Sequence, residues 1–138
     1  MERRPQVRVV TGMSGLLVAF SLIVMTHCAI VNKHIRDSQV TNGLSSATDY
    51  ATNVCQDMYE SLDFEAMDKA EAKKQIISVF CKALESVIGT DGDVWVYVAK
   101  ADLETGLFDF VVEENYKYSF RGRTGTARCE RVVCFGAE

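Results

Sequence analysis

The side chains best suited to catalysis or metal binding in this chain are its five cysteines and two histidines. Both histidines, His27 and His34, lie in or beside a long apolar segment near the N-terminus, and no histidine follows them. A Ser-His-Asp triad or a Cys-His pair needs an imidazole beside the nucleophile. The chain beyond His34 therefore cannot build such an arrangement, and we expect the protein not to be an enzyme.

The cysteines lack the spacing of a zinc site. Cys28 lies in the apolar segment, and of the other four only Cys129 and Cys134 are close in sequence, with a wider gap than the usual C-x2-C pair. If this part of the chain lies outside the cytoplasm, four cysteines could form two disulfides in one of three pairings, or stay as buried thiols. The candidate disulfide cysteines are Cys55, Cys81, Cys129 and Cys134. No metal or cofactor is expected, and the pairing stays open.

The acidic residues also lack a catalytic pattern. Glu113 and Glu114 are neighbours in a predicted strand, so their side chains point to opposite faces and do not make an acid–base pair. Asp91-Gly92-Asp93 resembles part of a calcium loop, but the further ligands of that motif are missing. We expect a simple turn there. The chain also has no dinucleotide-binding, phosphate-loop or H-E-x-x-H motif.

The charge balance argues against a nucleic-acid partner. The segment from Asn32 to Glu138 holds 12 lysines and arginines against 18 acidic residues, a net charge of −6. Nucleic-acid binding needs a basic surface, which this acidic balance does not favour, although a local basic cluster lies near the C-terminus. That cluster is either a solvated hairpin or a docking surface for an acidic partner. Its members are Arg121, Arg123, Arg128 and Arg131.

The N-terminal part of the chain predicts a membrane-spanning helix. Val9–Val31 contains no Asp, Glu, Lys or Arg over 23 residues, and about 20 apolar residues suffice to cross a bilayer. The arginines that precede it favour an N-terminus in the cytoplasm and a domain outside the cell membrane. A cleaved signal peptide is the alternative, but Met25–Ala29 has no A-x-A cleavage pattern. We therefore predict residues 1–8 inside, a single span at 9–31, and an external domain at 32–138.

Small and polar residues recur along one side of this predicted helix. Ser14, Ser21 and Cys28 are seven residues apart, and Gly15 lies beside the first of them. Small residues allow transmembrane helices to approach closely. The pattern suggests packing against another membrane helix, although serine and glycine are also common in such helices without a partner.

The remaining chain predicts an α+β domain. The membrane helix is expected to continue, or to restart at Asp37, with an apolar face that ends near Leu62. A second, amphipathic helix is expected from Phe64 to Ile88, with Asp63 as its N-cap and Gly89 at its C-terminal end. Three strands joined by short turns, the first of them at Leu103–Gly106, then predict an antiparallel meander. Their ranges are Val94–Ala99, Leu107–Phe120 and Thr126–Phe135.

In this layout the chain resembles the TadE-like minor pilins, or pseudopilins, of tight-adherence pilus systems. The resemblance lies in the apolar segment Val9–Val31, the following IRDSQV (Ile35–Val40), and the closing YKYSFRG (Tyr116–Gly122) and TARCERVV (Thr126–Val133). It implies a non-catalytic membrane-anchored subunit that works in assembling a pilus or related secretion apparatus. Its expected partners are other pilin-like or membrane subunits, in a hetero-oligomer.

The resemblance also implies a processing site and shows one departure. Prepilins of this type are cut after a glycine, so Gly12 and Met13 are the candidate cleavage pair. The fifth residue after the cut is normally glutamate, but here it is Leu17. An unprocessed accessory subunit therefore fits better than a major filament subunit.

A membrane-anchored sensor or ligand-binding domain is the alternative function. Its expected cleft would be lined by aromatic residues of the predicted strands, which more often serve as cross-strand packing. These residues are Trp95, Tyr97, Tyr116 and Tyr118.

Overall fold

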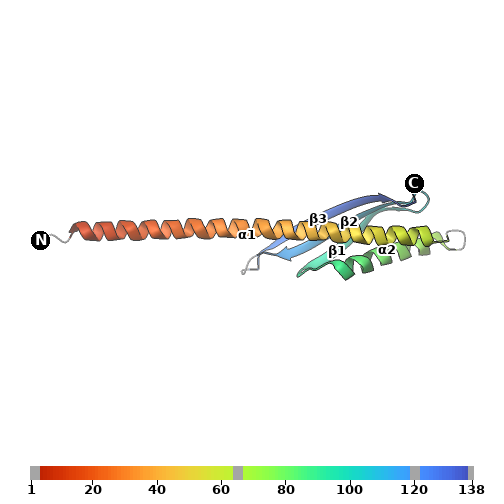
Figure 1. Ribbon diagram of the computed structural model, residues 1–138, viewed down its shortest axis with the longest axis horizontal. Coiled ribbons are helices and arrows are strands. Elements are labelled where there is room, and N and C mark those ends of the chain that lie inside the picture. Colours follow the sequence, from red (N-terminus) through yellow and green to blue (C-terminus); the bar gives the residue numbers. More distant parts are fainter. Residues whose placement is uncertain (1–3, 64–66, 119–121, 137–138) are drawn as a thin grey trace. The chain divides into compact units, whose positions relative to one another are not determined.

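The computed structural model describes residues 4–63, 67–118 and 122–136, with side chains from Met13 onward (Figure 1). The chain forms two units, Met1–Arg36 and Asp37–Glu138. Within the described ranges the second unit contains two helical segments and a three-stranded antiparallel sheet, as the sequence predicted. The elements are α1 (Arg4–Ser61), α2 (Lys69–Val87), β1 (Asp93–Asp102), β2 (Leu107–Lys117) and β3 (Thr124–Cys134).

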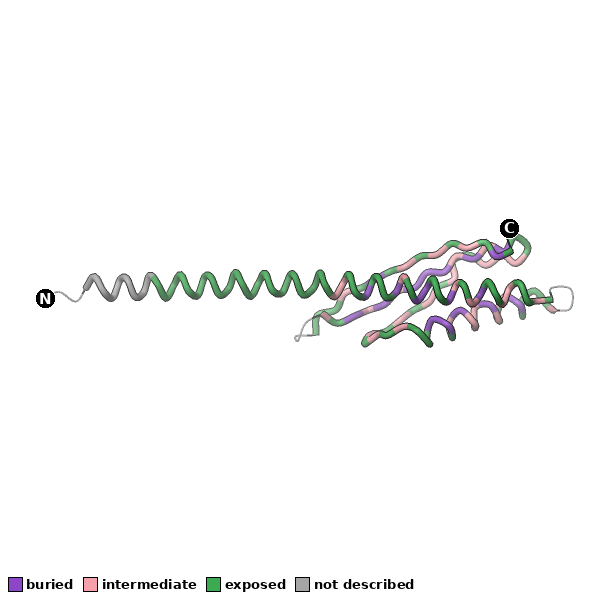
Figure 2. Tube along the Cα trace, viewed as in Figure 1, coloured by how far each residue is buried: buried purple, intermediate pink, exposed green. Residues whose placement is uncertain are grey.

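Helix α1 changes character along its length (Figure 2). Every residue from Met13 to Ile35 is exposed, whereas from Val40 onward one side of the helix is buried. The buried positions Val40, Leu44 and Ala51 follow the predicted apolar spacing, since residues three and four apart share a helix face. No break occurs at Asp37, so the alternative of a continuous helix is the correct one.

Helix α2 begins later than predicted. It starts at Lys69, and its N-cap is Asp68, whose carbonyl accepts a hydrogen bond from the Ala72 amide at 2.9 Å. Asp63 as the N-cap is therefore wrong, and the predicted start at Phe64 lies outside the described residues. The apolar periodicity that identified this helix begins only at Ile76, so the sequence pattern did not define its first turn. At the other end Ile88 is the C-cap, and Gly89 follows it without a positive φ.

The sheet has the order β1-β2-β3, with both pairs antiparallel. The predicted turn at Leu103–Gly106 is present, and Gly106 has a φ of +67°, which a residue with a Cβ rarely adopts. A register shift between Val98 and Lys100 marks a bulge in β1. The end of β2 predicted at Phe120 lies outside the described residues, and β3 starts at Thr124, two residues earlier than expected.

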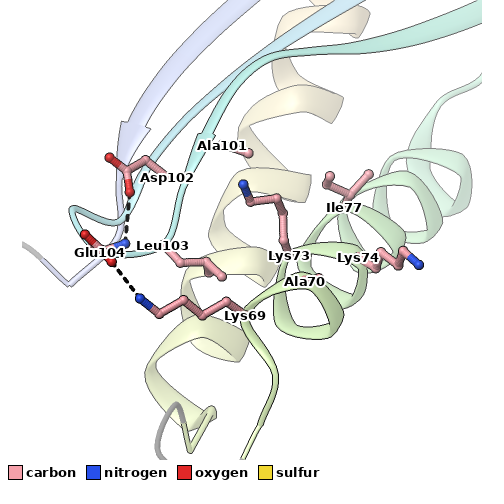
Figure 3. Close-up of a pocket in the computed structure, with 9 residues that line it drawn as sticks. All are labelled: Lys69, Ala70, Lys73, Lys74, Ile77, Ala101, Asp102, Leu103 and Glu104. Carbon is pink, nitrogen blue, oxygen red and sulfur yellow. Dashed lines mark hydrogen bonds and ion pairs between the residues drawn. The ribbon is translucent and has the colours of Figure 1, made fainter.

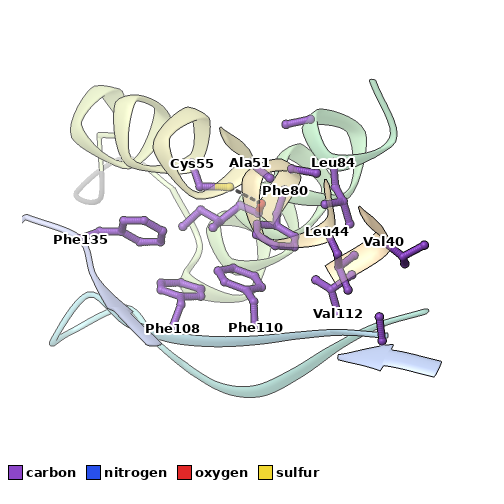
Figure 4. Packing of buried hydrophobic residues seen from close by; sticks show 14 of the residues in the cluster. Val40, Leu44, Ala51, Cys55, Phe80, Leu84, Phe108, Phe110, Val112 and Phe135 are labelled. Carbon is purple, nitrogen blue, oxygen red and sulfur yellow. Dashed lines mark hydrogen bonds between the residues drawn. The ribbon is translucent and has the colours of Figure 1, made fainter. Parts of the chain in front are cut away.

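The core lies between the helices and one face of the sheet (Figure 4). Phe80 of α2 stacks on Phe110 of β2, with ring centroids 3.9 Å apart and planes 3° from parallel. Phe108 and Phe135 continue this aromatic layer, with their centroids 5.3 Å apart. Alternate residues of β2 point into this layer, which is why β2 is the most buried strand. The opposite face of the sheet has no covering layer among the described residues.

Candidate functional site

The first feature with functional meaning is the exposed apolar part of α1. It is the one described helix that is long and apolar enough to cross a membrane, and its most apolar 18-residue window has a mean hydropathy of 2.1 with none of its residues buried. Soluble proteins rarely expose a continuous apolar surface of this extent. The segment therefore needs either lipid or protein around it.

Two polar side chains within this segment bond to its own backbone. The Ser21 hydroxyl donates to the Leu17 carbonyl at 2.9 Å, and the Thr26 hydroxyl donates to the Leu22 carbonyl at 2.8 Å. An unsatisfied hydroxyl would be costly in hydrocarbon, whereas a bond to the carbonyl four residues earlier removes that cost. These residues are thus compatible with a lipid-facing position and do not require a protein partner.

The predicted processing and packing residues all lie on this helix. Gly12 and Met13 are both inside α1, and the Met13 side chain is exposed. In the stripe, Gly15 has open space around the position of a Cβ, and Ser14, Ser21 and Cys28 are exposed. The surface offered to a second helix is therefore open, and packing along it stays a prediction.

The second feature is a set of long-range polar contacts that fix the sheet to α1 within the domain. The Tyr116 hydroxyl donates to the Asp37 carboxylate at 2.6 Å, across 79 residues of sequence. Farther along α1, the Arg131 side chain of β3 contacts Asp49, and the Tyr59 hydroxyl donates to the Leu103 carbonyl at 3.1 Å. These anchors are spaced at about 15 to 18 Å along the helix axis. The helix is therefore held over most of the domain's length.

Arg131 makes the most extensive of these contacts. Its Nε donates to Asp49 Oδ1 at 2.6 Å, and its Nη2 donates both to Asp49 Oδ2 at 3.2 Å and to Ser45 Oγ at 2.9 Å. The paired guanidinium holds the pKa of Asp49 below its ordinary value. Two parallel bonds make the pair geometrically specific, although solvent screens it because both side chains are more than a third exposed.

Replacing Arg131 by alanine is expected to lower the free energy of unfolding at pH 7 by about 1 kcal/mol. The pKa of Asp49 is lower in the folded state than in the unfolded state. The stabilisation that the pair gives is therefore fully present at a pH above the unfolded-state pKa, and it disappears as the pH falls through the folded-state pKa. The difference between wild type and R131A should therefore shrink in acid, as measured by urea unfolding at pH 7 and pH 3. Arg128→Ala is the control, because the two described carboxylates that Arg128 contacts, at 3.5 and 3.6 Å, both belong to the sheet. An equal loss in R128A would contradict the role given to Arg131.

The four candidate disulfide cysteines lie in different surroundings. Cys55 is fully buried and its thiol donates to the Ile76 carbonyl at 3.5 Å, while Cys81 is half-buried. Cys129 packs against the core, and Cys134, five residues farther along the strand, is exposed on the other side of β3. All five cysteines of the chain are free thiols in this structure, and disulfide formation stays a prediction.

Cys55 is expected to be chemically inert in the folded protein. Burial, with a smaller contribution from nearby Cys81, raises the pKa of its thiol from 9.0 to about 12. The thiolate fraction at neutral pH then falls about a thousandfold, and the thiolate is the reactive form. Maleimide labelling of the native protein, followed by peptide mass spectrometry, should modify Cys134 quickly and Cys55 only after unfolding in urea. Rapid native labelling of Cys55 would contradict this and would indicate a reactive thiol.

The other predicted groups do not assemble into one site. Glu114 is buried and accepts a hydrogen bond from the Thr90 hydroxyl, whereas Glu113 lies on the opposite face beside Arg128. The predicted basic cluster is dispersed, because Arg128 and Arg131 point to different faces of β3, and Arg121 lies outside the described residues. Among the described residues, no group of three or more His, Cys, Asp or Glu side chains could hold a metal ion.

The predicted aromatic cleft is not formed. Trp95 pairs with Glu113 in the ladder and is 41% exposed on the open face of the sheet, with Tyr97 next to it on that face. Tyr116 is buried on the opposite, core-facing side. The alternation of side chains along neighbouring strands separates these residues, and the sequence prediction did not include the strand register.

Sequence reasoning missed a groove between α2 and the β1–β2 turn (Figure 3). Its volume is about 530 Å³, and its apolar lining comes from Ala70, Ile77, Ala101 and Leu103. The remaining lining residues are Lys69, Lys73, Lys74, Asp102 and Glu104. The lysine spacing on α2 was visible in the sequence, but the strand that completes the groove is more than twenty residues away.

Comparison with known proteins adds no relative to this picture. No protein-family model, no curated protein and no solved structure matches the chain.

Proposed function

We propose that the protein is a non-catalytic, membrane-anchored, pilin-like subunit that works in the assembly of a tight-adherence type pilus or a related secretion apparatus. The observation that carries this proposal is helix α1: its residues from Met13 to Ile35 are all exposed and mostly apolar, whereas from Val40 onward one face of the same helix is buried in the domain core. In a subunit built in this way, the apolar part of one helix can anchor the chain in a membrane while the rest of the same helix carries a domain that docks on other subunits.

The polar contacts along α1 support this role. Side-chain hydrogen bonds join three positions of α1 to the sheet or its turns: Asp37, Asp49 and Tyr59. Such repeated anchoring makes the helix and the sheet one rigid body within the domain. A subunit that transmits force, or that positions neighbouring subunits, requires this rigidity.

The proposed orientation has residues 1–8 in the cytoplasm and the domain outside the cell membrane. The arginines that precede the apolar segment support it, because basic residues favour the cytoplasmic side. The excess of acidic residues in the domain fits a location away from anionic lipid headgroups.

Deletion of the gene in its native host tests the assembly role. We expect loss or strong reduction of surface pili, or of the material secreted by the apparatus, as measured by electron microscopy and by analysis of the culture fluid. Wild-type protein supplied in trans should restore both, and a variant with a charged apolar segment should not. If the deletion strain assembled pili and secreted normally, the proposed role would be wrong.

A ligand-binding role is the second candidate, and the exposed pair Trp95 and Tyr97 favours it. These rings are 41% and 50% exposed and lie on the same open face of β1. Aromatic rings on an open sheet can stack on a sugar of the cell wall. Binding of purified cell-wall glycan that is lost in Trp95→Ala would support this role, and equal binding by wild type and W95A would count against it.

A further inference from the structure

The two ends of the α/β domain carry features of opposite charge. One end holds the groove between the start of α2 and the end of β1, with the lysines Lys69, Lys73 and Lys74 on its rim. The other end holds the turn that follows α2 and precedes β1, residues 88–92. Since α2 has 19 residues, these ends are about 28 Å apart. The groove and the turn of one chain therefore cannot meet each other.

The groove has unused positive charge. Lys69 is paired with Glu104, with 2.6 Å between Nζ and Oε1, and this carboxylate raises the pKa of Lys69. Asp102 accepts a hydrogen bond from the Glu104 amide and so stabilises its own turn. Within the described ranges, neither Lys73 nor Lys74 makes a salt bridge. Lys73 is half-buried, and Figure 3 shows its amine on the side of the groove that faces Ala101. An acidic group entering the groove would find a cation beside an apolar wall.

The turn at the opposite end is rigid, and acidic residues lie in it and on either side of it. From Ala83 to Ala99 the chain has three acidic residues, Glu85, Asp91 and Asp93, and no lysine or arginine. All three are exposed.

The rigidity of the turn comes from its packing on β2. The Thr90 hydroxyl donates to the buried Glu114 carboxylate, and its oxygen accepts from the Gly92 amide at 3.0 Å. A Cβ on Gly92 would lie 1.5 Å from the Asn115 carbonyl oxygen, so the turn fits closely against β2. A preorganised turn loses little conformational entropy when it binds.

We propose that the acidic turn of one copy docks into the lysine groove of the next copy, so that the domains associate head to tail. The groove volume of about 530 Å³ lies within the range in which proteins commonly hold ligands, about 300 to 1,000 Å³, and it leaves room for the side chains of a short turn. The charges are complementary, and each chain has one turn and one groove. Such a heterologous contact is not satisfied by a pair of copies as a twofold contact is: it produces an open row, or a ring if the rotation between copies closes.

Exposed ion pairs are individually weak, at about 0.2 to 1 kcal/mol each. The contact therefore suits a row that is stabilised by repetition. For its biological role the inference rests on the proposed assembly function, but the contact itself can be measured without it.

Cross-linking tests the contact directly. The full chain in membranes would carry Lys73→Cys and Asp93→Cys, with the exposed native thiols removed by Cys28→Ala and Cys134→Ala. A short bismaleimide should then give a ladder of dimers, trimers and larger products on a denaturing gel, because each chain has both reactive ends. A chain with only one of the two new cysteines should stop at the dimer. The matched control joins Asp93→Cys with Lys82→Cys, which is exposed on α2 but outside the groove.

Several outcomes would overturn the proposal. These are the absence of products larger than those of the single-cysteine chains, the same ladder from the Lys82 control, and cross-linking of the groove cysteine only to a different protein.

A charge swap gives a second measurement on purified protein in detergent by sedimentation. Lys73→Glu should weaken self-association about tenfold, and adding Asp93→Lys should restore it to within about threefold of wild type. Equal association of K73E and wild type would contradict the proposal.

Failure of this inference and failure of the assembly role are distinguishable. A ladder in a strain whose pili do not depend on the gene would leave the contact standing and remove the pilus role. Loss of pili on gene deletion, together with no ladder, would remove the contact alone.

Discussion

Replacing Phe110 by alanine is expected to lower the free energy of unfolding of the domain by about 3 to 5 kcal/mol. Phe110 is fully buried at the centre of the aromatic layer, stacked on Phe80 and 5.8 Å from Phe108 between ring centroids. Removing the ring leaves a cavity that the neighbouring side chains, held on three different elements, can only partly fill. A domain of this size is stable by only about 5 to 15 kcal/mol, so the loss is a large share of the total.

Trp95 makes this change measurable, because it is the only tryptophan of the chain and lies in β1 beside β2. Its fluorescence would follow urea unfolding of the full chain in detergent. Tyr97→Ala is the matched control: an aromatic residue of the same sheet that is 50% exposed, for which we expect a loss below about 1 kcal/mol. Similar losses in F110A and Y97A would contradict the placement of the core on one face of the sheet.

Two charges in the apolar segment are expected to abolish membrane retention. Phe20 is the middle residue of Val9–Val31, and Ile23 is one helical turn away. An arginine at the centre of a membrane helix costs about 2.5 to 3.5 kcal/mol on insertion scales, so Phe20→Arg with Ile23→Arg costs about 6 kcal/mol. That difference corresponds to a factor of about ten thousand in the insertion equilibrium.

Alkaline extraction of membranes followed by immunoblotting measures this effect. The variant with both arginines should move from the membrane pellet to the soluble fraction or be degraded. Thr41→Arg with Asn53→Arg is the matched control, since both positions are exposed on the part of α1 that lies in the domain. If the variant with Phe20→Arg and Ile23→Arg remained in the pellet as the control does, the apolar segment would not be the anchor.

The sequence predicted the elements well because their signals are local. The apolar spacing from Val40 to Ala51 and the short turn at Leu103–Gly106 depend on residues close together in the chain, and both were confirmed. The start of α2 was placed wrongly, because residues before Lys69 carry no apolar periodicity: the prediction took Asp63 as the N-cap, whereas the N-cap is Asp68.

The functional contacts were harder to predict because they join distant parts of the chain. Arg131 was grouped with its sequence neighbours as a basic cluster, yet its partner Asp49 is 82 residues away. Trp95 and Tyr116 were placed in one cleft, whereas the strand register puts them on opposite faces. The groove likewise needs the position of β1 beside α2. Pair distances of this kind depend on the tertiary packing, and no local pattern in the sequence specifies them.

The mass and N-terminal sequence of the protein, isolated from the membrane fraction of its native host, give the most direct test of a retained anchor. A membrane-anchored pilin-like subunit should retain most of the apolar segment, with a chain that either keeps Met1 or begins at Met13. A start at Met13 would show that a prepilin peptidase recognises Gly12 despite Leu17 at the fifth position. A chain that begins beyond Cys28 and is found in the soluble fraction would mean that the segment is a cleaved signal peptide, and it would contradict the membrane-anchored role.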